Sequence, residues 1–238
     1  MNLNELILRR KSCRSYTNVP VEAALLDQIA ALELKPLYPE IHTRWQIVPR
    51  KNVRCICPWT TPQVITVYSE PKPGYLENVG FLFQQFDLQL QRMGLGVCWL
   101  GMGRPSSQSA DSVDGMDFVI MLAFGHPKGE FLRTGPEQFH RKKLLDITDR
   151  EDSRLEPARL APSSVNSQPW FFLHDSDVIH VYCACKGLLK PVLGEMNRID
   201  IGIALAHLYV SNSESFRFFQ KTDAPQKTGY AYLGSLTL

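Results

Sequence analysis

The alternation of apolar and polar positions predicts helices and strands along the first part of the chain. Residues 19–33 carry apolar side chains at helical spacing after a proline that suits a helix start. Residues 63–70 are rich in β-branched side chains, which is typical of a strand. Residues 79–96 predict a long apolar helix that ends at two glycines. Residues 117–127 are almost wholly apolar, which predicts a strand buried on both faces.

A similar order of elements begins again after residue 140. The expected elements are helical pieces at 142–148 and 152–162, strands at 168–175 and 177–185, a long apolar helix at 199–215, and strands at 216–220 and 230–238. The order helix, strand, strand, long helix, strand therefore occurs twice. We interpret this as an α+β fold made of two related halves, residues 1–140 and 141–238.

Length, composition and charge narrow the class of protein. The chain has 238 residues, of which 44% are apolar, so it can bury a sizeable core as one domain or two intimate halves. Its 26 basic and 24 acidic residues are mixed along the sequence, which argues against a nucleic-acid partner. No apolar run reaches the roughly 20 residues of a membrane span, and the N-terminus does not resemble a signal peptide. A cytoplasmic protein is expected.

Two segments contain pairs of cysteines with one residue between them. These are Cys55 and Cys57, and Cys183 and Cys185, each in an apolar, strand-like run. Side chains at i and i+2 share one face of a strand. The pairs therefore predict either a four-thiolate metal site or small apolar side chains on two strands. Structural zinc sites more often have at least two residues between their cysteines, which favours the interpretation without a metal.

A short basic turn follows the first apolar residues of the chain. Residues 9–14 contain no acidic side chain and bring together Arg10, Lys11, Ser12 and Arg14. Guanidinium groups and a hydroxyl offer several donors to one phosphate dianion. The segment is either a phosphate site or a solvated basic turn, and composition alone favours the second.

A glycine-rich segment, MGLGVCWLGMG at residues 93–103, forms the exit from the long apolar helix. A backbone without Cβ atoms can approach a flat ligand closely. The glycines do not have the G-x-G-x-x-G placement after a strand, so a dinucleotide site of that type is disfavoured. Taken alone, a plain helix end is the simpler interpretation.

A polar turn between apolar segments, APSSVNSQPWFF at residues 161–172, carries a further group of hydrogen-bonding side chains. Hydroxyl and amide groups can match the edge of a heterocycle that has both donors and acceptors. In this turn they belong to Ser163, Ser164, Asn166 and Gln168. Pro162 and Pro169 restrict the backbone, so that these groups are partly preordered.

Together these three segments resemble one family, the nitroreductase-like flavoproteins. APSSVNSQPWFF resembles the Ala-Pro-Ser-x-x-Asn-x-Gln-Pro-Trp signature of that family. RRKSCRSY resembles its N-terminal Arg-x-Ser-x-Arg motif, and GLGVCWLG resembles its Gly-Leu-Gly-x-x-Trp-Leu-Gly segment. The resemblance covers most of the chain and is weakest over residues 34–60 and 211–238.

The order of the motifs departs from that of the family. In the family the Pro-Ser-x-x-Asn motif follows the first helix, whereas here it occurs only in the second half. The second half opens with FHRKKLLDIT, a degraded match to RRKSCRSY, and has SNSESF where GLGVCWLG would fall. Family members are usually homodimers with FMN at the subunit interface. The resemblance therefore implies an intramolecular pseudo-dimer in which one chain suffices for a single composite FMN site.

The resemblance also implies roles for individual residues. The FMN phosphate is expected to contact Arg10, Lys11, Ser12 and Arg14, with Arg141 and Lys142 as later basic residues near it. The ribityl and pyrimidine parts are expected to contact Pro162, Ser163, Ser164 and Asn166. The flavin N5 edge is expected to face backbone groups of Leu100 and Gly101.

The implied activity is that of an FMN-dependent oxidoreductase. NAD(P)H would deliver hydride to flavin N5, which would pass it to a nitroaromatic, a quinone or a related small electrophile. The flavin carries the chemistry, so no catalytic side chain and no metal are expected. The histidines at 42, 126, 140, 174, 180 and 207 are expected to be structural, and Trp99 and Trp170 to be core anchors.

Alternatives to a working reductase remain open. The chain is alternatively a flavin store or sensor without turnover, or a relative that has lost FMN and acts as an interaction module. Among enzymes, a flavin-fragmenting or dehalogenating activity is a further alternative.

Overall fold

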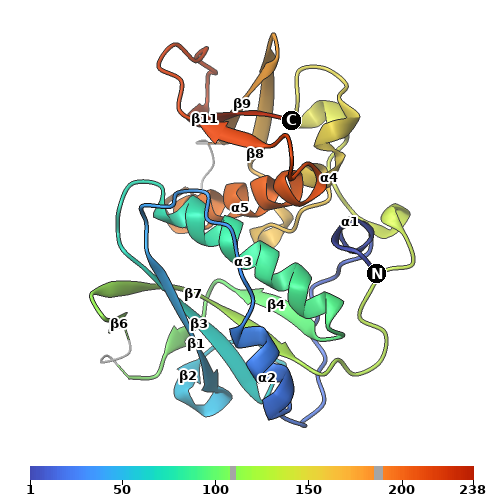
Figure 1. The fold of residues 1–238 in the computed structure, drawn as a ribbon, viewed down its shortest axis with the longest axis vertical. Coiled ribbons are helices and arrows are strands. Elements are labelled where there is room, and N and C mark those ends of the chain that lie inside the picture. Colours follow the sequence, from blue (N-terminus) through green and yellow to red (C-terminus); the bar gives the residue numbers. More distant parts are fainter. Residues whose placement is uncertain (108–110, 185–189) are drawn as a thin grey trace.

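The structure is a computed structural model and describes residues 1–107, 111–184 and 190–238. Two antiparallel sheets lie on opposite sides of a central pair of long helices, α3 (Tyr75–Arg92) and α5 (Lys190–Ser211) (Figure 1). The N-terminus lies beside α1 (Leu3–Ile7), and the C-terminus lies at the second sheet (Figure 1). No helix of the described ranges is long and apolar enough to cross a membrane.

The first sheet is formed before residue 126. Its strands are in the order β1-β3-β7-β4, and all neighbours are antiparallel. They are β1 (Thr43–Pro49), β3 (Gln63–Ser69), β7 (Met116–Gly125) and β4 (Gly96–Leu100), with β6 (Ser112–Val113) paired to β7. Helix α2 (Ala23–Ala30) precedes this sheet, and α3 connects β3 to β4. A separate two-stranded pair consists of β2 (Val53–Arg54) and β5 (Arg104–Pro105).

The second sheet repeats the order of the first. Its strands are β8 (Trp170–Asp175), β9 (Val178–Ala184), β11 (Tyr230–Thr237) and β10 (Arg217–Phe219), adjacent in that order and antiparallel. The short helix α4 (Glu156–Arg159) precedes them, and α5 connects β9 to β10. When the strands of each sheet are numbered in sequence order, their spatial order is first, second, fourth, third. Along the sequence, the long helix of each half follows the second strand and precedes the third. The repeat that the sequence predicts is therefore present in the topology, while the boundary at residue 140 stays a prediction.

The two long helices cross at a pair of glycines. A Cβ on Gly80 of α3 would lie 2.0 Å from the carbonyl oxygen of Ile199, and a Cβ on Gly202 of α5 would lie 2.0 Å from that of Glu77. Each glycine thus contacts the residue three positions before the other. Such reciprocity is what two equivalent surfaces produce around a twofold axis. Only glycine permits so close an approach of the two backbones.

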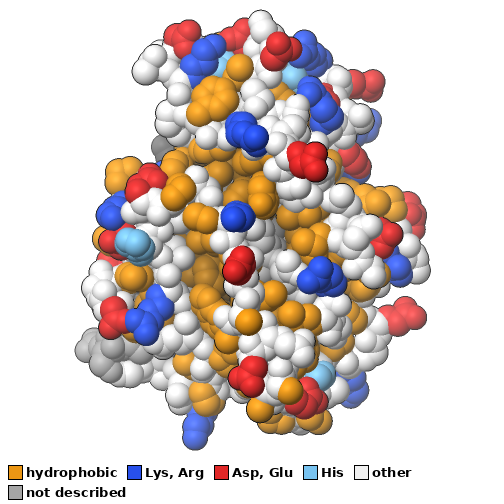
Figure 2. Space-filling model, in the orientation of Figure 1, with side chains coloured by type: hydrophobic (Ala, Val, Ile, Leu, Met, Phe, Trp, Pro, Cys, Tyr) orange, Lys and Arg blue, Asp and Glu red, His pale blue; other side chains and the backbone are white. Residues whose placement is uncertain are grey.

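One continuous apolar core joins the sheets and the helices. It includes Phe83 and Phe86 of α3, Leu122 and Phe124 of β7, Phe172 of β8, and Leu205 of α5. On the face in Figure 2, apolar side chains gather in a hollow across the middle, and basic and acidic side chains are interspersed around it. That face has no continuous field of one charge.

Several elements differ from the sequence predictions. Strands β1 and β4 were not predicted, because Pro49 ends the first and the glycines of residues 93–103 obscure the second. The helical piece expected at 142–148 is a 3₁₀ turn at Leu144–Asp146. The piece expected at 152–162 is a 3₁₀ turn followed by the short α4, in which Pro157 occupies a first-turn position. Helix α5 begins at Lys190, nine residues before the predicted start. Cys185, with the end of the strand predicted at 177–185, lies outside the described residues.

Candidate functional site

A cavity of about 380 Å³ lies between the two halves of the chain and receives side chains from both. Of the residues predicted from the sequence, Ser12, Arg14, Leu100 and Gly101 line it from the first half. Pro162, Ser163 and Ser164 line it from the second half. The structure thus brings together three motifs that are up to 150 residues apart (from residue 12 to residue 162).

Strand β4 positions the first wall of the cavity. The arm that carries Ser12 runs alongside it, with a bridge from Ser12 to Val97 and a 2.8 Å hydrogen bond from the Cys13 amide to the Val97 carbonyl. A Cβ on Gly96 would lie 2.5 Å from the Cys13 sulfur, so only glycine admits the arm this closely. The arm places Ser12 and Arg14 at the edge of the cavity.

The second wall is a strained loop. Val165, Asn166 and Gln168 have φ values of 47°, 57° and 48°, which non-glycine residues rarely adopt. The backbone amide of Gln168 donates to the Ser163 hydroxyl oxygen (2.9 Å), and this hydrogen bond joins the two ends of the loop. This strain persists only because neighbouring groups hold the loop from two sides.

Three residues that were expected to bind a ligand instead form hydrogen bonds within and next to this loop, on the side away from the cavity. Arg141 Nη1 donates to Asn166 Oδ1 (2.7 Å), and Asn166 Nδ2 donates to the His140 carbonyl (3.0 Å). Lys142 Nζ donates to the Gln168 carbonyl (2.8 Å). Among the residues that the structure describes, Arg141, Lys142 and Asn166 do not line the cavity. Their positions here are those of supports for the loop.

From the front, the loop is held by Asp200 of α5. The Ser164 amide donates to Asp200 Oδ1 (3.1 Å) and Oδ2 (3.0 Å), and the Ser164 hydroxyl contacts the Met196 sulfur at 3.3 Å. Asp200 is only 3% exposed and lines the cavity. Burial raises the pKa of Asp200 to about 8, and the Ser164 N–H opposes that rise. The carboxyl is therefore largely protonated at neutral pH.

Arginines concentrate beside the start of the chain. Arg10 is 1% exposed, its Nη2 lies 3.4 Å from Asp87 Oδ2, and its Nε has no hydrogen-bond partner among the described residues. Arg133 donates to the Arg10 carbonyl and packs its guanidinium 4.0 Å from the centre of the Phe139 ring. Burial, followed by the charges of Arg10, Arg133 and Arg159, lowers the pKa of Arg141 to about 10. Such crowding favours an anion nearby.

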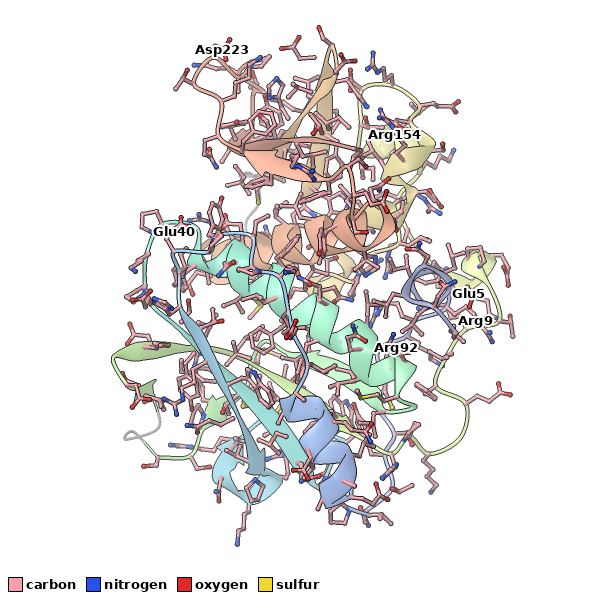
Figure 3. The ribbon with its side chains drawn as sticks, viewed as in Figure 1. Glu5, Arg9, Glu40, Arg92, Arg154 and Asp223 are labelled. Carbon is pink, nitrogen blue, oxygen red and sulfur yellow. The ribbon has the colours of Figure 1, made fainter. Side chains whose placement is uncertain are left out.

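The other basic residues of the first turn face outward. Arg9 lies near Glu5 at the outer side of the N-terminal arm (Figure 3), and its Nε donates to the Arg133 carbonyl (2.9 Å). Lys11 is exposed, and its backbone amide donates to Gln91 (3.4 Å). Among the described residues that line the cavity, Arg14 is therefore the one predicted basic residue.

A chain of hydrogen bonds fixes Trp99 at the cavity. Its Nε1 donates to Gln84 Oε1 (3.2 Å), and Gln84 Nε2 lies 3.1 Å from His207 Nε2. His207 Nδ1 lies 2.9 Å from the Pro157 carbonyl, so Nδ1 carries the proton. Burial lowers the pKa of His207 to about 3, and the ring is neutral. Trp99 is only partly buried and lines the cavity, whereas Trp170, 2% exposed, is the core anchor that was expected.

Two cysteines contribute neutral thiols to the cavity. Cys57 and Cys98 line it, and the sulfurs of Cys55 and Cys57 are 3.1 Å apart. Burial raises the pKa of Cys57 to about 11 and that of Cys98 to about 12. The described part of the chain contains no group of three or more metal-ligating side chains.

The comparisons with known proteins point in one direction. A family model with the description "Putative TM nitroreductase" matches residues 2–212. A solved structure described as a putative nitroreductase, from Thermotoga maritima, has a TM-score of 0.69 and 22% sequence identity, covering 100% of this chain and 94% of that chain. A nitroreductase family protein from Clostridium difficile has a TM-score of 0.51 and 19% identity, covering 64% of this chain and 99% of that chain. No curated protein matches the sequence.

Proposed function

On the premise that the chain belongs to the TM nitroreductase family, we propose that it is an FMN-dependent oxidoreductase with one flavin site between its two halves. The family model confirms the family that the three motifs predicted, and the solved structure from Thermotoga maritima confirms the α+β fold. The observation that carries the proposal is the cavity itself, where the basic arm, the glycine-rich strand and the Pro-Ser-Ser loop converge.

The residues present suit FMN. Arg14 and Ser12 at the cavity edge are donors for a phosphate. The Nε of buried Arg10, which has no partner among the described residues, is a further donor in the same arm. Trp99, Ile120 and Ile203 provide an apolar lining for an aromatic ring system. Gly101 also lines the cavity, and a Cβ there would lie 2.9 Å from the Met196 methyl carbon, so glycine leaves room for the Met196 side chain.

FMN, when bound, would supply the chemistry for hydride transfer between NAD(P)H and a small electrophile such as a nitroaromatic or a quinone. The protein would bind and orient the ring and exclude water from it. The loop of residues 162–168 arrives preordered, because Asp200 and Arg141 hold it in a conformation that it would not adopt alone. The thiols of Cys57 and Cys98 are protonated at neutral pH, so neither acts as a nucleophile there.

The proposal is tested by the absorbance of the purified protein, with released flavin quantified per chain, followed by anaerobic addition of NADH or NADPH. One FMN per chain that bleaches supports a reductase with a single composite site. FMN that stays oxidised under excess of either nicotinamide supports a store or sensor. A colourless protein that FMN does not reconstitute contradicts flavin binding altogether.

A further inference from the structure

The reciprocal crossing of the helices makes two positions directly comparable. Asn78 stands two residues before Gly80 on α3, and Asp200 stands two residues before Gly202 on α5. Both side chains are buried, with exposures of 0% and 3%. They occupy matching places in the two halves of the molecule.

The two side chains perform the same structural task. Asn78 Oδ1 accepts hydrogen bonds from the amides of Leu37 and Tyr38, each at 2.9 Å. Both carboxyl oxygens of Asp200 accept a hydrogen bond from the Ser164 backbone amide. In each half the side chain holds the loop that precedes the sheet. An amide oxygen suffices for this task in the first half, so loop holding does not explain why the second half has a carboxyl.

The difference lies in what each side chain faces. Asp200 lines the open cavity, whereas Asn78 does not, and its amide nitrogen lies 3.4 Å from the Ile41 carbonyl. A carboxyl that is buried without an ion pair among the described residues is costly when ionised. A group with that property at a ligand cavity gains or loses a proton readily when the charge or hydration of the cavity changes.

The other charged and titratable groups around Asp200 are accounted for. Cys57 and Cys98 in the cavity stay neutral, which leaves Arg14 as the charge that shares the lining. On the facing helix α3, Glu77 is paired with Arg198 (2.6 Å). Other groups on elements that pack on α5 are bonded elsewhere: Glu156 with Arg159, Asp87 with Arg10, His174 with Asp149, His180 with Ser235, Asp175 with Lys221, and Glu5 with Asn2. Tyr75 and Arg92 of α3, and Tyr182 and Cys183 of β9, do not line the cavity.

We propose that the Asp200 carboxyl is a proton-exchanging group of the cavity. It is protonated when a ring system is bound beside it, takes up that proton from solvent wherever the empty cavity leaves it ionised, and keeps the proton while the ring carries negative charge. The proton forms an O–H bond at a carboxyl oxygen, and no other bond of the protein changes. For FMN as the ring system, this inference rests on the proposed function.

The first test compares the affinity of the flavin-free protein for FMN between about pH 6.5 and about pH 9.5, measured by quenching of flavin fluorescence. In the wild-type protein we expect the Kd to rise above about pH 8, by up to roughly tenfold per pH unit. Asp200→Asn keeps an oxygen for the Ser164 amide and cannot ionise. Its Kd is therefore expected to be flat where the wild-type Kd rises, while ionisation of the FMN phosphate affects both proteins alike.

Asn78→Asp is the matched control. It places an ionisable carboxyl at the equivalent position of the other half, away from the cavity. We expect its FMN Kd to follow the wild-type pH profile, because no ligand meets the new carboxyl. A second readout is proton uptake on adding FMN near pH 8, followed with an indicator dye. The wild-type protein should take up a fraction of one proton per FMN, and Asp200→Asn should take up none.

The outcomes separate this inference from the function on which it rests. Equal pH profiles and equal proton uptake in the wild-type and Asp200→Asn proteins overturn the role of Asp200 and leave FMN binding intact. If neither protein binds FMN at any pH, the proposed function fails instead. In that case the unfolding of the flavin-free proteins still tests the carboxyl. Wild-type stability should decline from about pH 4 to about pH 8 relative to Asp200→Asn, and parallel profiles would contradict a buried neutral carboxyl.

Discussion

The two halves use one architecture, but the two equivalent places between them differ in the described residues. One place, called the open place, borders the cavity, and the other, called the filled place, holds the Tyr38 and Phe218 rings. In the second half, the loop before the sheet borders the cavity. In the first half, the corresponding loop turns Tyr38 inward: the Tyr38 ring would lie 2.8 Å from a Cβ on Gly74, and it meets Phe218 edge-on at 5.8 Å. Gln220 Nε2 lies 3.4 Å from the Tyr38 hydroxyl. The same scaffold thus borders a cavity on one side and packs partly buried aromatic side chains on the other.

This comparison explains why the sequence keeps each motif only once. The basic arm and the glycine-rich strand of the first half meet the Pro-Ser-Ser loop of the second half at the open place. At the filled place, residues 34–42 and β10 meet instead, and aromatic side chains replace the polar ones. The polar motifs therefore lie at the cavity, whereas aromatic side chains lie at the other place.

The largest expected effect comes from breaking the relation between the halves. Gly202→Ala should abolish or severely impair folding, because its Cβ would lie 2.0 Å from the Glu77 carbonyl oxygen, which is backbone and cannot move aside. Gly194→Ala is the control in the same helix. Nothing lies within 4 Å of its Cβ, so a gain of about 0.5–1 kcal/mol is expected. Urea unfolding measures both, and equal stability of the two variants would contradict the close crossing.

A large effect on binding is expected at the open place. Arg14→Met should raise the Kd for FMN by roughly 10- to 100-fold, because a charge-assisted contact to phosphate is lost. The matched control is Arg44→Met, which removes an exposed arginine that pairs with Asp114 at the surface. Fluorescence titration with FMN compares the two. If Arg44→Met weakened binding as much, net charge rather than the arm would account for the affinity.

A smaller effect is expected from loosening the loop. Asn166→Ala removes the acceptor of Arg141 and the donor to the His140 carbonyl. We expect FMN affinity to fall by about tenfold, because the loop becomes less ordered before binding. Hydrogen exchange of the Ser164 and Gln168 amides should quicken in the same variant. Unchanged exchange would show that Asp200 alone holds the loop.

The smallest effect on binding is expected at the filled place. Tyr38→Ala should lower the free energy of unfolding by about 2 kcal/mol, since the ring is only partly buried. The FMN stoichiometry should stay at one per chain, because the second half has neither the arm nor the glycine-rich strand. Flavin quantification measures it. A second FMN in this variant would mean that Tyr38 alone closes the filled place.

Much of the fold and part of the site could be predicted from the sequence. The long apolar runs predicted α3 and α5, and the β-branched run predicted β3, because burial on several sides leaves a continuous apolar pattern. β1 escaped prediction, since exposed Arg44 and half-buried Gln46 interrupt its apolar positions and Pro49 ends it. Ser12, Arg14 and the Pro-Ser-Ser loop were predicted from the resemblance of their segments to family motifs, since composition alone favoured a solvated turn at residues 9–14.

Other residues at or near the site lie outside the motifs and could not be predicted from them. Asp200 was missed because it lies within a helix, although a single carboxyl in the apolar run IDIGIALAHL is a sign of a buried acid. Arg133 lies in an irregular segment where no period indicates burial. Trp99 was expected to be a core anchor, but its strand lies at the cavity, and that position depends on packing between the halves.

The glycine crossing also bears on how the molecule responds to a ligand. A compound bound in the cavity touches both halves at once, close to where their helices meet. Its binding free energy therefore adds to the free energy of unfolding of the whole chain and not to that of either half alone. Thermal melting with saturating ligand should remain a single transition with a higher midpoint temperature. The midpoint of melting therefore reports how far the cavity is occupied.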